Sequence, residues 1–110
     1  MKQCITVEQL EELKSDDKVC KLNTLMGHNW MIPREEMSDM TWNKILKDTA
    51  EYCTIGKMIE IAEPTRITYN AEYNGWDVIV GNIAFAGVEL CDALWEAVKA
   101  TLITKFEKED

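Results

Sequence analysis

The chain has 110 residues, with 12 Lys and Arg against 20 Asp and Glu, so its formal net charge is −8. This length predicts one domain over residues 1–110, and a hydrophobic content of 46% is typical of a protein with a packed core. The acidic balance argues against direct binding to nucleic acid or to an anionic membrane, which requires clustered cations, but is compatible with a basic protein partner.

The first third of the chain mixes one clear helix signal with ambiguous segments. Thr6 and Gln9 form a capping-box pattern, which predicts a helix over residues 7–14. The apolar residues within 18–25 fit neither the helical nor the strand period well, and we expect a strand there. Pro33 excludes a continuous helix through residues 27–33, which we expect to be irregular.

Two helices are expected in the middle of the chain. Ser38 is a suitable N-cap for a helix over residues 39–52, and Thr54 for a second helix over residues 55–62. The succession of two helices is also compatible with a helix-turn-helix motif. Because the few lysines there lie among acidic residues, we favour two core helices over a DNA-binding motif.

A β-hairpin is expected over residues 67–80. Its two halves alternate in hydrophobicity, and Asn74-Gly75 between them is the typical sequence of a two-residue type I′ turn. Such a turn would place Tyr73 opposite Trp76 and Tyr69 opposite Val80. Residues 81–87 are expected to add a short third strand.

A long amphipathic helix is expected over residues 88–106. Its apolar side chains fall on one arc, which would cover one face of the hairpin. The predicted fold class is therefore α+β, with a small antiparallel sheet packed by this C-terminal helix and by shorter N-terminal helices. Residues 107–110 are expected to form a frayed, charged tail.

The sequence contains no catalytic, cofactor or metal motif that we recognise. The four cysteines are widely separated and there is one histidine, so the spacing of a zinc site is absent. We expect the cysteines to be free and buried in a reducing, cytoplasmic environment. His28 lies in the irregular segment without a nucleophile motif, and the scattered glycines form no phosphate-binding loop.

Two sets of residues are candidates for binding a partner protein. Trp30 and Met31 could form an exposed apolar patch, with burial in the core as the alternative. Glu89, Asp92 and Glu96 are spaced to lie in a row on the outer side of the last helix. This row could meet a basic surface, and the alternative is a role in solubility alone.

Four segments of the chain resemble a group of small proteins. They are residues 5–10 (ITVEQL), residues 54–61 (TIGKMIEI), Trp76, and residues 89–99 (ELCDALWEAVK). Together they resemble small uncharacterised proteins encoded by phages and mobile elements of Gram-positive bacteria, over most of residues 5–99. The resemblance implies a cytoplasmic accessory protein, and it carries no known activity or site residues.

The function that we expect is therefore non-enzymatic binding to a host or phage protein. One form of it would be inhibition, in which an acidic surface occupies the basic site of the partner. Two alternatives stay open, a small enzyme with an unrecognised site and a structural or assembly component of a phage particle. The sequence also leaves the oligomeric state open.

Overall fold

A computed structural model describes residues 2–28 and 32–106 of the protein. Its elements in chain order are α1 (Val7–Leu10), η1 (Glu11–Leu13), α2 (Asp16–Leu25), η2 (Arg34–Glu36), α3 (Asp39–Tyr52), α4 (Ile55–Ala62), β1 (Arg66–Asn70), β2 (Gly75–Val80), β3 (Ile83–Gly87) and α5 (Leu90–Phe106). The strands form one antiparallel sheet in the order β1-β2-β3, and α5 packs on it. The expected α+β fold is confirmed, and the expected tail at residues 107–110 lies outside the described residues.

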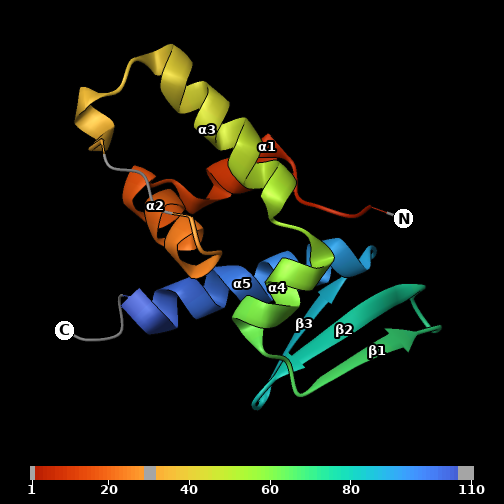
Figure 1. The fold of residues 1–110 in the computed structure, drawn as a ribbon. Coiled ribbons are helices and arrows are strands. Elements are labelled where there is room, and N and C mark those ends of the chain that lie inside the picture. The colour runs from red at the N-terminus through yellow and green to blue at the C-terminus, as the bar shows by residue number, and fades with distance from the viewer. Residues whose placement is uncertain (1, 29–31, 107–110) are drawn as a thin grey trace.

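Helix α5 lies at the centre of the molecule (Figure 1). It packs against β2 and β3 on one side. It also packs against α4 and against α2, which belongs to the N-terminal part of the chain. Ala93 is close to the backbone of Gly87 at the end of β3, whereas the indole of Trp95 donates a hydrogen bond to Glu12 in η1. Both residues are fully buried. The predicted apolar arc is therefore correct but too narrow, because α5 is covered from more than one side.

The predicted helix caps are confirmed. The hydroxyl of Thr6 accepts a hydrogen bond from the Gln9 backbone while the Gln9 side chain accepts one from the Thr6 backbone, and the predicted helix over residues 7–14 is observed as α1 followed by η1. Ser38 and Thr54 cap α3 and α4 in the same way. These helix starts depend only on residues close in sequence, because each capping side chain accepts a hydrogen bond from the backbone N–H group three residues further on.

The predicted strand within residues 18–25 is wrong, because this segment is helix α2. Ser15 caps it, and Val19, Leu22, Asn23 and Met26 form its buried face at helical spacing. Asn23 is a polar residue on this buried face, and it therefore interrupts the apolar pattern of the helix in the sequence. Its amide is buried among apolar residues and donates hydrogen bonds to the Val19 carbonyl and to the Thr49 hydroxyl, at 3.1 and 2.8 Å.

The predicted two-residue turn of the hairpin is also wrong. A four-residue loop over residues 71–74 joins the strands, and Tyr69 pairs with Trp76 instead of Val80. Asn74 does adopt a positive φ of 54°, but Gly75 already belongs to β2. The register differs from the prediction by four residues, an even number, so Val78 remains on the buried face of β2, whereas Tyr73 lies in the exposed loop.

Gly75 is required for strand packing and not, as the sequence predicts, for the hairpin turn. A Cβ atom at this position would lie 2.8 Å from the carbonyl oxygen of Gly87. Glycine is therefore required where β2 and β3 approach closely, and the Asn-Gly pair does not form the turn. The Tyr73 side chain folds back over this point, and its hydroxyl donates to the Trp76 carbonyl at 3.1 Å and contacts the Asp77 carboxylate.

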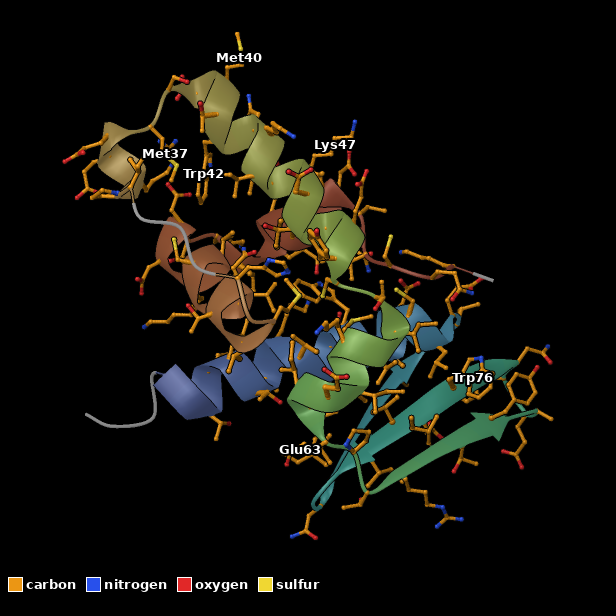
Figure 2. The ribbon with its side chains drawn as sticks, in the orientation of Figure 1. Met37, Met40, Trp42, Lys47, Glu63 and Trp76 are labelled. Carbon is orange, nitrogen blue, oxygen red and sulfur yellow. The ribbon has the colours of Figure 1, made fainter. Side chains whose placement is uncertain are left out.

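The N-terminal half of α3 and the short η2 form an arm that extends away from α5 (Figure 1). Met40 points outward from this arm and is 83% exposed (Figure 2). Trp42 points toward the rest of the molecule and is only 5% exposed (Figure 2). The underside of the arm is therefore apolar, and it faces α1, η1 and the start of α2.

Candidate functional site

The predicted acidic row is held by cations from the same chain. Lys2 Nζ lies 2.7 Å from Asp92 Oδ1, which also accepts a hydrogen bond from Gln9 Nε2 at 3.0 Å. The backbone N–H of Lys2 donates to Glu89 at 3.4 Å, and Glu96 forms an ion pair with Lys99 at 3.0 Å. The row thus faces the N-terminal segment rather than open solvent alone.

Glu12 joins the acidic row to the N-terminal helices. Its carboxylate accepts hydrogen bonds from Lys99 Nζ at 2.7 Å and from Trp95 Nε1 at 3.1 Å. The hydrogen bond from Lys99 lowers the pKa of Glu12 below its ordinary value, and partial burial opposes this change only in part. These contacts attach η1 to α5, and Lys99 also pairs with Glu96, so Lys99 connects Glu12 to the row.

Trp30 and Met31, the predicted apolar patch, lie outside the described residues. Their neighbour His28 is described. Its imidazole packs against the Tyr52 ring, with ring centroids 4.3 Å apart and ring planes tilted by 41°, and its backbone N–H donates to the Asn23 carbonyl at 2.8 Å. These contacts place His28 beside the C-terminal end of α3.

A surface groove of about 450 Å³ lies between the arm and the N-terminal helices. We call it the α1–α3 groove. Its floor is apolar and is formed by Leu10, Val19, Trp42 and Leu46. Its rim is polar and is formed by Glu11, Lys14, Ser15 and Asp16. A volume of this size is within the range of about 300–1,000 Å³ that is usual for binding sites.

Local sequence features position the walls of the groove. Lys14 ends η1 in the left-handed conformation, with φ 57°, and turns the chain into the Ser15 cap of α2. Arg34 in η2 lies over the ring of Trp42, 4.7 Å from its centroid, and its Nε is 3.2 Å from an Asp16 carboxylate oxygen. Arg34 thus connects the arm to α2 and supports the Trp42 ring that lines the groove.

The sequence predicts apolar faces for some residues of the groove, but not the groove itself. Trp42 and Leu46 were expected on a core face of the helix over residues 39–52, and Val19 in a strand. Because a strand is expected within residues 18–25, the sequence does not predict the α2 wall of the groove. The available signal was the helical spacing of Val19, Leu22 and Met26, which becomes clear once Asn23 is accepted as a buried residue.

A second, smaller hollow of about 210 Å³ lies between α5 and the end of the sheet. Its lining includes Ala97, Ala100 and Thr101 of α5 together with Val80 and Phe85 of the sheet. The small side chains of α5 leave this space where the helix passes the turn between β2 and β3. Its volume is below the usual range for ligand sites.

The chemistry of the described thiols does not favour nucleophilic catalysis. Burial raises the pKa of Cys53 to about 12 and that of Cys91 to about 11, and it also raises the pKa of Cys20. At neutral pH these three groups are thiols, whereas the thiolate is the reactive form. All four cysteines are free, with Cys53 and Cys91 buried and the other two partly exposed, so the expected burial applies fully to two of them.

Among the residues that the structure describes, no three His, Cys, Asp or Glu side chains come together in a way that could hold a metal ion. Within residues 2–28 and 32–106, no helix combines the length and the apolar character needed to cross a membrane. No protein-family model, curated protein or solved structure matches the chain.

Proposed function

We propose that the protein is a non-enzymatic binding module that takes an apolar segment of a partner protein in the α1–α3 groove. The observation that carries this proposal is the groove itself, with Trp42 and Leu46 on one wall and Leu10 and Val19 at its base. Aromatic and aliphatic side chains in a concave, partly dry site are the usual anchors of protein interfaces. An amphipathic helix inserted between diverging helices is a common form of such recognition.

Charge has a separate role in this proposal. The net charge of −8 attracts a basic partner over a distance, and the groove then retains it through apolar contacts. The exposed carboxylates of Glu11, Glu35 and Glu36, on the groove rim and in η2, are better placed for such attraction than the predicted row. Asp92 and Glu96 are already engaged by Lys2 and Lys99.

The proposed setting is a cytoplasmic accessory protein of phage or mobile-element origin, which acts on a host or phage protein. The resemblance of residues 54–61 and 89–99 to such proteins supports it. A small acidic domain that occupies a basic site needs no catalytic residue, and the protonated thiols agree with that requirement. Inhibition of the partner is the simplest consequence of occupying its basic site.

The test compares the wild-type protein with two lysine variants as baits in a lysate of a Gram-positive bacterium. Leu46→Lys places a charge in the groove, whereas Ile103→Lys is a matched change at an exposed position of α5, away from the groove. Thermal unfolding first establishes that both variants fold. We expect one protein to be retained by the wild type and by Ile103→Lys but lost with Leu46→Lys.

The affinity of the captured protein for each bait then separates the two roles. Leu46→Lys is expected to weaken binding about tenfold or more, mainly through faster dissociation. The triple change Glu11→Gln, Glu35→Gln, Glu36→Gln is expected to slow association and to reduce its dependence on salt. Equal capture by the wild type, Leu46→Lys and Ile103→Lys would exclude the groove as the binding site.

A further inference from the structure

Strand β3 forms an edge of the sheet and has no charged side chain. The eleven residues from 78 to 88 contain no Asp, Glu, Lys or Arg, although 29% of the chain is charged. Ile83 at the start of β3 is 59% exposed, and Val88 directly after it is 75% exposed. Natural proteins usually protect an edge strand with charges or proline, and β3 has neither.

The hydrogen-bonding pattern shows which backbone groups of β3 face outward. The carbonyl of Ile79 accepts from the backbone N–H of Thr65 at 2.8 Å, so the backbone of Ile79 points toward β1. Neighbouring residues of a strand point in opposite directions, and therefore Val78 points toward its partner Phe85. It follows that Ala84 and Ala86 direct their N–H and C=O groups away from the sheet.

The opposite edge of the sheet is protected. Strand β1 begins with Arg66, a charged residue of the kind that protects an edge strand. Glu72 follows β1 in the loop. The contrast between the two edges indicates that the exposure of β3 is a specific feature rather than a general property of this sheet.

We propose that two copies of the chain pair through β3, antiparallel and centred on Phe85. In this register Ile83 lies opposite Gly87 of the second copy, which has no side chain to obstruct it. Ala84 lies opposite Ala86 of the second copy, and their outward backbone groups form the new hydrogen bonds. The segment Ile83–Gly87 is thus complementary to itself in size, and its lack of charge allows two molecules of charge −8 to approach there.

This pairing is independent of the α1–α3 groove, because β3 and the groove have no residue in common. It also depends on salt in the opposite direction. Two acidic copies repel one another, so added salt strengthens the dimer, whereas it weakens the attraction of a basic partner. Failure of one proposal therefore leaves the other intact.

Sedimentation equilibrium of the purified protein over a range of concentrations and salt tests the pairing. We expect a reversible monomer–dimer equilibrium that shifts toward dimer as salt rises. Ala84→Lys places like charges near the dimer axis and is expected to weaken the dimer about tenfold or more. Ala86→Pro removes an outward N–H group and is expected to have a similar effect.

The control is Thr68→Lys, which puts the same charge on the same face of the sheet but at the β1 edge, and should leave the dimer unchanged. Thermal unfolding checks the fold of each variant, and Ala84→Lys keeps every backbone group if Ala86→Pro does not fold. A wild-type protein that remains monomeric at all concentrations would overturn the proposal. A dimer that persists in Ala84→Lys would overturn it equally, because another surface would then be responsible.

Discussion

Asn23 and Thr49 form a buried polar pair that connects α2 with α3. They are 3% and 1% exposed, and the amide of Asn23 donates to the Thr49 hydroxyl at 2.8 Å. A buried polar group without a partner costs more than a well-formed hydrogen bond contributes, so each residue depends on the other.

We expect Thr49→Val to lower the free energy of unfolding by about 1–2 kcal/mol, because it leaves part of the Asn23 amide unpaired in the core. Adding Asn23→Leu to Thr49→Val should recover part of that loss, since both polar groups are then removed. Urea denaturation of the two single variants and the double variant measures this coupling. Asn43→Ala, at an exposed position of α3, is the control, and strictly additive effects at Asn23 and Thr49 would contradict the argument.

The contact between Glu12 and Lys99 predicts a dependence of stability on pH. The hydrogen bond from Lys99 lowers the pKa of Glu12 below 4.5, so its contribution is present above pH 4.5 and is lost as the pH falls through the lowered value. For Lys99, burial works against charge but the carboxylates of Glu12 and Glu96 outweigh it. Its pKa is raised above 10.5, and its contribution is lost as the pH rises through that raised value.

Glu12→Gln is therefore expected to lower the free energy of unfolding by about 0.2–1 kcal/mol near neutral pH, a small effect because the Glu12 side chain is 47% exposed. Urea denaturation from acid to alkaline pH should show the difference from wild type shrinking at both ends. Glu51→Gln, on the exposed side of α3, serves as the control. A difference that stays constant over the whole pH range would show that the change in packing, and not the charge, is responsible.

At the scale of elements, the glycines differ in what they permit. A Cβ atom on Gly87 would lie 2.7 Å from the backbone nitrogen of Ala93, so this glycine allows β3 to approach α5. Gly56 lies in the first turn of α4, and a Cβ atom there would meet nothing closer than the Thr54 hydroxyl at 4.0 Å. One glycine is required by packing, and the other weakens its helix.

Opposite effects on stability are thus expected from the same substitution. Gly87→Ala should lower the free energy of unfolding by about 1–3 kcal/mol, because backbone atoms of α5 would have to move. Gly56→Ala should raise it by about 0.4–1 kcal/mol through the better helix propensity of alanine. Thermal or urea unfolding of the two variants is the measurement, and destabilisation by both would contradict the distinction.

Local signals in the sequence were sufficient for most elements. The hydroxyls of Thr6, Ser38 and Thr54 mark the starts of three helices, because a cap involves only residues that are close in sequence. The hairpin register required information about β3, since Gly75 is needed for its approach to Gly87. Helix α2 required knowledge of Thr49, the distant partner that allows Asn23 to be buried.

At the scale of the whole molecule, the candidate site was the least predictable part. The spacing of Glu89, Asp92 and Glu96 suggested an open acidic surface, but Lys2 and Gln9 reach this row from the other end of the chain. The α1–α3 groove similarly depends on the path of the arm, which no periodicity describes. Spaces between elements are set by tertiary packing, whereas sequence patterns report which side of one element is apolar.

The central position of α5 affects how the protein is made. Synthesis proceeds from the N-terminus, so α5 is the last described element to leave the ribosome, although α2, α4, β2 and β3 all pack on it. Until then these elements have no common surface to bury, and the nascent chain exposes their apolar faces together with the uncharged β3 edge. A chaperone that binds apolar segments during translation would therefore find these faces exposed until α5 has been synthesised.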